Sequence, residues 1–125
     1  MKYLLFVALG GAAGAVMRYA MANWIHRLWE GHFPLGTLLV NALGSLAIGV
    51  LYVLILERQA LHPDWRDITM IGFLGAFTTF STFSLETVHL IEAGQWLYAA
   101  LYIGASVLVC VALAGVAMQL TRALL

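Results

Sequence analysis

The sequence predicts an all-α integral membrane protein with four transmembrane helices. Of its 125 residues, 63% are hydrophobic and only 10% are charged, and the mean hydropathy is +0.95. A soluble domain is closer to half apolar and a quarter charged. Four apolar segments, separated by short polar connections, each supply the roughly 20 helical residues needed to cross a hydrocarbon core of about 30 Å. We expect residues 1–125 to form a single membrane domain.

The first helix is expected over residues 3–25 and the second over residues 35–56. The first contains one charged residue, Arg18, and the second contains none. We interpret the first segment as a membrane helix rather than a cleaved signal peptide. Its positive region is a single lysine, and its apolar character resumes beyond Arg18.

The third helix is expected over residues 68–91 and the fourth over residues 96–120. The third contains Glu86 and His89, of which the histidine is expected at the membrane interface, and the fourth contains no charge. All the tryptophans lie at or beside predicted helix ends, as an interfacial aromatic belt requires: Trp24, Trp29, Trp65 and Trp96.

Charged residues and cysteine exclude several other classes of protein. The formal net charge is zero, so the chain has no basic surface for nucleic acid. A single cysteine excludes an internal disulfide, and no cluster of cysteines and histidines has the spacing of a structural metal site.

Basic residues give only a weak signal for orientation. With the N-terminus in the cytoplasm, Lys2, Arg58, Arg66 and Arg122 lie inside and Arg27 lies outside. So small a bias allows the chain to insert in both orientations.

Four helices bury too little surface to enclose a pore, so the oligomeric state matters. Small residues four positions apart permit close helix packing, and they occur as Gly10 with Gly14 and as Ala100 with Gly104. These pairs fit either packing within one chain or a homodimer. The need to line a path favours the homodimer.

Within the third helix, residues 72–86 are unusual for a membrane segment. They contain two glycines, four phenylalanines and five Ser or Thr residues. Ser and Thr compete for backbone hydrogen bonds and Gly weakens a helix, so we expect the helix to bend or break here. Irregular backbone at membrane depth is tolerated only where protein buries it or where it lines a wet path. This segment is therefore the best candidate for an ion or substrate pathway.

Two polar stripes with a four-residue spacing lie on the second and fourth helices. They consist of Thr37, Asn41 and Ser45 and of Tyr102, Ser106 and Cys110. The amide of Asn41 has more donors and acceptors than its own preceding turn can satisfy. Asn41 is therefore either a clamp between helices or a donor that faces a conducted anion.

Arg18 and Glu86 are the charged residues within the membrane helices, and such residues are functional candidates by default. Because the first and third helices run parallel, we expect the two side chains at similar depth. They either form a salt bridge or reach the interface, or Arg18 attracts anions to a vestibule while Glu86 orders a hydroxyl track.

Phe77, Phe80 and Phe83 recur every three residues of the third helix. Such a stripe is commonly plain packing, but here hydroxyl residues lie between the rings. The edge of an aromatic ring carries positive potential and supports a small anion weakly. A Lys or Arg at the same place would bind the ion too tightly to release it quickly.

These features resemble the Fluc (CrcB) fluoride-channel family. The likeness rests on Asn41 within Gly-Thr-Leu-Leu-Val-Asn, on Gly-Ala-Phe-Thr-Thr-Phe-Ser-Thr-Phe-Ser-Leu-Glu from Gly75, and on the early Gly-Gly-x-x-Gly with Arg18. It covers the whole chain. The resemblance implies a fluoride-specific channel, not an enzyme, that passively exports F⁻ and lowers its concentration in the cytoplasm. It also implies a dual-topology homodimer of two antiparallel chains with two pores, in a bacterial inner membrane.

The resemblance assigns roles to particular residues. Phe80 and Phe83 would contact fluoride, with Asn41 donating to the ion and Arg18 in the aqueous entrance. Backbone carbonyls of Gly75 and Thr78 from both chains would hold a structural Na⁺. The polar lining would comprise Ser81, Thr82, Thr37, Glu86, Tyr102 and Ser106, while Cys110 occupies a position where a hydroxyl is expected.

Three other functions compete with a fluoride channel. A small multidrug transporter needs a buried carboxylate, typically in the first helix, and the first helix has none. In a fluoride/proton antiporter, Glu86 would shuttle protons, but it lies near a helix end. In an assembly subunit of a larger complex, partners would satisfy Asn41, and its substitution would lower stability rather than flux.

Overall fold

The computed structural model describes residues 1–125 and contains helices but no strand. Four helices are long and apolar enough to cross a membrane, so the prediction of four membrane-spanning helices is confirmed. They extend over Lys2–Leu28, Leu35–Glu57, Arg66–Glu92 and Trp96–Leu124, slightly beyond the predicted bounds.

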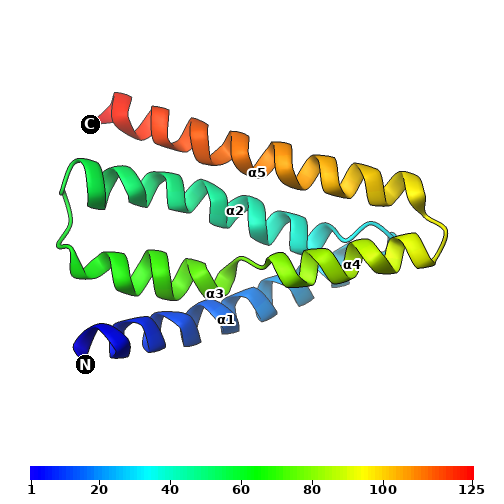
Figure 1. Cartoon of the computed structure of the whole chain (residues 1–125), viewed down its shortest axis with the longest axis horizontal. Helices are drawn as coiled ribbons and strands as arrows, with labels where there is room; N and C mark the ends of the chain where they lie inside the picture. Colours follow the sequence, from blue (N-terminus) through cyan, green and yellow to red (C-terminus); the bar gives the residue numbers. More distant parts are fainter.

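The chain alternates in direction along one bundle, and both termini lie at the same end (Figure 1). The first and fourth membrane helices are single α-helices, whereas the second and third are each built from several segments. In chain order the elements are α1 (Lys2–Leu28), α2 (Leu35–Leu51), the π-helical η1 (Tyr52–Glu57), the π-helical η2 (Arg66–Leu74), α3 (Gly75–Phe77), α4 (Phe80–Glu92) and α5 (Trp96–Leu124).

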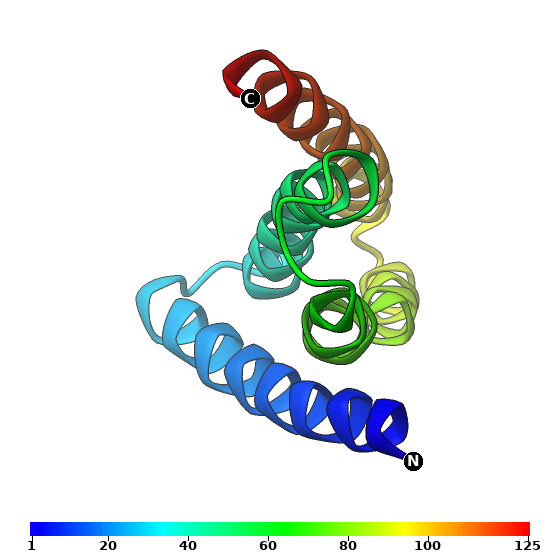
Figure 2. The same ribbon diagram turned by 90° about the vertical axis from the view of Figure 1, so that its left-hand side faces the viewer.

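Helix α2 lies in the middle of the bundle. It packs against α5 on one side, while α1 packs against η2 and α3 (Figure 2). One apolar cluster of Val40, Leu74 and Phe77 joins α2 to the third membrane helix. A second cluster, which includes Leu90 and Tyr102, joins α4 to α5.

The outer helices leave most of their apolar surface uncovered. Within α1 and α5, only 11% of the most apolar stretch is buried inside the chain. Since large apolar side chains on these helices face outward, lipid or a second protein must cover them.

The turn between α4 and α5 is made by a glycine in the left-handed region, Gly94, with φ 77°. The N–H of Gly94 donates to the Ile91 carbonyl (3.0 Å) and the N–H of Gln95 donates to the Leu90 carbonyl (2.8 Å). This pair of bonds satisfies carbonyls at the end of α4 and reverses the chain tightly. The short turn holds α5 beside α4.

Close packing of α1 against the third membrane helix depends on Gly10 and Gly14. A Cβ atom on Gly10 would overlap the Ile68 carbonyl oxygen, and one on Gly14 would overlap the Phe73 carbonyl. The glycine pair of α1 therefore packs within the chain. By contrast, a Cβ on Gly104 of α5 would meet nothing within 4 Å, so that surface is open to lipid or a partner.

Gly10→Ala is expected to lower the free energy of unfolding by about 1–3 kcal/mol, because added volume in a tight contact strains the backbone. Gly11→Ala is the matched control, since its Cβ would meet only the Gly72 carbonyl oxygen at an ordinary 3.7 Å. Unfolding by SDS, followed by tryptophan fluorescence, measures both variants. Equal stabilities of the two would contradict this assignment of the α1 contact.

Candidate functional site

The backbone is extended at two consecutive residues in the middle of the third membrane helix. Thr78 has φ −82° and ψ 156°, and Thr79 has φ −151° and ψ 118°. Each threonine hydroxyl bonds to a helix end. Thr78 Oγ1 donates to the Leu74 carbonyl (2.9 Å), and Thr79 Oγ1 accepts from the N–H of Thr82 (3.2 Å), as expected of an N-cap threonine.

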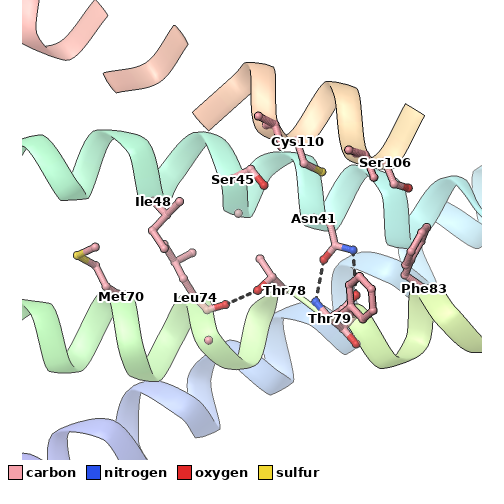
Figure 3. A pocket seen from close by; sticks show the side chains of 15 residues that line it. Asn41, Ser45, Ile48, Met70, Leu74, Thr78, Thr79, Phe83, Ser106 and Cys110 are labelled. Atoms are coloured by element: carbon pink, nitrogen blue, oxygen red, sulfur yellow. Dashed lines mark hydrogen bonds between the residues drawn. The ribbon is translucent and has the colours of Figure 1, made fainter. Parts of the chain in front are cut away.

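Asn41 of α2 bonds to both backbone groups of Thr79 (Figure 3). Its Oδ1 accepts from the Thr79 N–H at 2.7 Å, and its Nδ2 donates to the Thr79 carbonyl at 3.0 Å. The Asn41 side chain thereby supplies the hydrogen bonds that the N–H and carbonyl of Thr79 would make to other backbone groups in a helix. Since an amide carries two N–H donors, one of them remains available beyond this clamp.

Because of these side-chain bonds, two backbone N–H groups do not donate to the carbonyls that would accept from them in a continuous helix. There, the N–H of Thr79 would donate to the Gly75 carbonyl and the N–H of Thr82 to the Thr78 carbonyl. Here they donate to Asn41 Oδ1 and Thr79 Oγ1. Gly75 is exposed on the surface of the chain.

A cavity of about 420 Å³ lies beside this segment, between α2, the third membrane helix and α5. We call it the Asn41 cavity; Figure 3 shows its lining side chains. It brings together eight residues singled out from the sequence: Asn41, Ser45, Gly75, Thr78, Phe80, Phe83, Ser106 and Cys110. The other lining residues are mainly apolar, and none is a lysine or arginine.

The phenylalanine stripe is divided by the extended residues. Phe77 is only 5% exposed and stacks on Phe73, with ring centroids 5.7 Å apart. Phe80 and Phe83 form a separate tilted pair at 5.4 Å. Phe80 lines the cavity, yet it is 78% exposed on the single chain. Phe77 therefore belongs to the core, and Phe80 has a face for a ligand or a second protein.

Ser106 of α5 is the one residue with a buried side-chain polar atom that has no hydrogen-bond partner. The residue is 9% exposed and lines the Asn41 cavity. Most buried hydroxyl groups are bonded, so an unpaired one needs an explanation such as a bound ion or water.

Tyr102 and Glu86 form a polar contact beyond the Asn41 cavity. The Tyr102 hydroxyl donates to Glu86 Oε1 at 3.0 Å, and the Tyr102 ring lies 5.0 Å from that of Phe83. Glu86 also lines a second cavity of about 310 Å³, together with His26, His32 and His89. Contacts through Tyr102 therefore link Phe83, which lines the Asn41 cavity, to Glu86, which lines the second cavity.

Arg18 lines neither of these two cavities. The expectation that Arg18 and Glu86 lie at similar depth in the membrane is wrong. Arg18 Nε donates to the Ala76 carbonyl at 3.0 Å, and no salt bridge joins it to Glu86. The contact of Gly14 with Phe73 fixes this alignment, so that His26, not Arg18, lies level with Glu86.

The remaining predicted lining residues do not border the Asn41 cavity. Ser81 is exposed and Thr82 is half-buried, while Thr37 is buried. The residue missed by the sequence analysis is Thr79, which anchors Asn41 and begins α4. Threonine is a favoured N-cap residue. Its place directly before Phe80-Ser81-Thr82 is the signal in the sequence that marks Thr79 as the start of a helix.

Four membrane-length helices, with a cavity between three of them that contains Asn41, Ser106 and Phe80, define a small multi-pass membrane protein with a candidate path for an ion. The family model described as "CrcB-like protein, Camphor Resistance (CrcB)" matches residues 5–118. The chain belongs to the CrcB family, and its resemblance to that family is confirmed.

Curated relatives match almost the whole chain. One from Saccharophagus degradans is 50% identical over 121 residues, which cover 96% of this chain and 90% of the relative. One from Nitratidesulfovibrio vulgaris is 47% identical, with 90% and 91% covered. One from Hahella chejuensis is 45% identical, with 98% and 97% covered. Each of these relatives is named "Fluoride-specific ion channel FluC".

Proposed function

We propose that this protein is a fluoride-specific ion channel that passively exports F⁻. The observation that carries the proposal is the Asn41 cavity, which offers neutral hydrogen-bond donors and aromatic rings but no lysine or arginine. Neutral donors can replace part of the ion's hydration shell without holding it too tightly to leave. The names of the relatives agree with this chemistry.

In this mechanism the chain's own residues replace water around the ion. The second N–H of Asn41 donates to fluoride, while the first continues to hold Thr79. The Ser106 hydroxyl, which has no partner in the chain, donates to the same ion or to the next position along the path. The edges of Phe80 and Phe83 supply weak positive potential. Beyond these groups, the Tyr102 hydroxyl donates its single proton to Glu86 Oε1, so it does not donate to the ion in this arrangement.

A second copy of the chain completes the path. Supporting this, Phe80 is 78% exposed although it lies at mid-span. One chain of four helices does not surround the Asn41 cavity, so an antiparallel homodimer with two pores is the proposed assembly. The weak bias of basic residues, which permits insertion in both orientations, supports the antiparallel arrangement.

Sodium is the proposed structural ion, held by the backbone carbonyls of Gly75 and Thr78 from both chains. The residues present fit such an ion, because the N–H groups that would otherwise bond to these carbonyls are engaged elsewhere. Hard cations prefer oxygen ligands of this kind. When bound, the ion would supply a fixed positive charge that favours an anion nearby.

Replacing Na⁺ by N-methyl-D-glucamine throughout purification is expected to weaken the dimer, because the freed carbonyls would then lack a partner. Size-exclusion chromatography with light scattering measures the dimer fraction, and re-addition of NaCl should restore it. KCl at equal ionic strength serves as the control. A dimer that is indifferent to sodium would remove the ion from the account.

The rival transport mechanisms receive less support from the site. No carboxylate lines the Asn41 cavity, as drug-cation exchange would require. Glu86 borders the outer, histidine-lined cavity and its Oε1 accepts from Tyr102, which places it poorly for proton coupling at mid-span. We therefore retain passive conduction as the mechanism.

The proposed setting is a bacterial inner membrane. A negative cell interior drives an anion outward by about 2.3 kcal/mol per charge per 100 mV, so an open fluoride pathway lowers cytoplasmic fluoride without a pump. Expression in a bacterium that lacks its own fluoride exporter is expected to permit growth at fluoride concentrations that stop the parent strain. No rescue by a well-expressed protein would oppose the export role.

A further inference from the structure

Cys110 is the only cysteine of the chain, and its thiol is free. It lies on α5, one turn after Ser106, and lines the Asn41 cavity. Figure 3 shows its sulfur projecting from α5 toward α2, in the space near Ser45 and Asn41. The thiol is therefore placed where the proposed ion path passes between these helices.

A second observation indicates that the same cavity accepts a ligand. Ser106 is 9% exposed, and its buried Oγ has no partner within the chain. Such an atom normally bonds to solvent or a ligand. The cavity is also lined by apolar side chains such as Ile48, Leu74 and Val107, against which the methyl group of a small neutral reagent can pack.

We propose that Cys110 is a modification site for small, neutral, thiol-reactive electrophiles, and that its modification blocks the ion path. The proposal rests on the proposed function, because block is defined by fluoride flux. Access of a reagent to the thiol is a separate claim that can be measured without flux.

Methyl methanethiosulfonate is the probe. The Cys110 thiol loses its proton to the buffer, and the thiolate attacks the sulfenyl sulfur of the reagent. A sulfur–sulfur bond forms to give Cys–S–S–CH₃, the bond between sulfur and the sulfonyl group breaks, and methanesulfinate leaves with the electron pair. Dithiothreitol reverses the reaction by thiol–disulfide exchange.

The experiment treats the full-length protein in liposomes and measures intact mass and fluoride efflux on the same sample. We expect the mass to increase by one S-methylthio group per chain and the efflux rate to fall about tenfold, equivalent to a barrier increase of about 1.4 kcal/mol. Dithiothreitol should restore both values.

Two variants serve as controls. Cys110→Ser should keep its own untreated rate when the reagent is added, because no thiol remains. In the Cys110→Ser background, Leu108→Cys places a thiol on a residue of α5 that is 71% exposed and does not line the cavity. It should be modified without loss of flux.

Modification of Cys110 with unchanged flux would overturn the proposal while leaving the channel function intact. Modification only after unfolding in SDS would overturn it as well, because the thiol would then be closed off in the folded protein. If the untreated protein released no fluoride, the channel function would fail. The mass of the folded protein would still support or overturn the modification site.

Discussion

Phe80→Ile is expected to reduce fluoride flux at least about 100-fold, a barrier increase of about 3 kcal/mol. The reason is that isoleucine keeps apolar volume but has no ring edge to support the anion. Phe80 is 78% exposed on the single chain, so its loss leaves no void in the chain's own core. The dimer should persist in size-exclusion chromatography.

Phe77→Ile is the matched control, three residues earlier in the same helix. Phe77 is 5% exposed and packs with Val40 and Leu74, so the variant should lose stability by about 1–3 kcal/mol while each folded dimer still conducts. Phe80→Ile is thus expected to lose flux while the dimer persists, and Phe77→Ile is expected to lose stability while the folded dimer still conducts. Unchanged flux in Phe80→Ile would remove that ring from the path.

Asn41→Asp is expected to reduce flux by a similar factor, at least about 100-fold. The carboxylate can still accept from the N–H of Thr79, but it loses both N–H donors, including the one that bonds to the Thr79 carbonyl. Any negative charge on the new side chain repels fluoride in the cavity. Flux is measured in liposomes at neutral pH.

The same variant discriminates between conduction and mere clamping. An unsatisfied Thr79 carbonyl costs about 1–3 kcal/mol of stability, which urea or SDS unfolding measures independently. If Asn41 served only as a clamp, as in an assembly subunit, stability would fall while the flux per folded dimer stayed normal. That result would contradict its role as a donor to the anion.

The four membrane helices were predictable because composition and spacing carry the information. Apolar segments between short polar connections leave few alternatives in a bilayer. Observed helices extend further than predicted, since helical hydrogen bonding continues into the polar flanks. α5, for example, ends at Leu124 rather than residue 120.

Part of the site was also predictable from periodicity. The four-residue spacing places Asn41 with Ser45, and Ser106 with Cys110, on one face of each helix, and all four line one cavity. What the spacing does not give is the partner of Asn41. The bonds to Thr79 depend on how α2 sits against the extended residues.

One expectation, that Arg18 and Glu86 lie at similar depth, failed because the offset between helices decides the result. Arg18 lies level with Ala76 because the Gly10 and Gly14 contacts set how far α1 slides along the third helix. Phe77 and Phe80 diverge because extended dihedral angles at Thr78 interrupt the helical period. The slide of one helix along another cannot be read from a stripe of residue types.

Fluoride efflux from liposomes that contain the purified protein distinguishes a fluoride-specific passive channel from the other candidate functions. A K⁺ gradient with valinomycin sets the driving force, and fluoride and chloride electrodes record both ions. A selective passive channel should release fluoride rapidly, without chloride and without an imposed proton gradient. Absence of fluoride release from well-folded protein, or equal release of chloride, would contradict it.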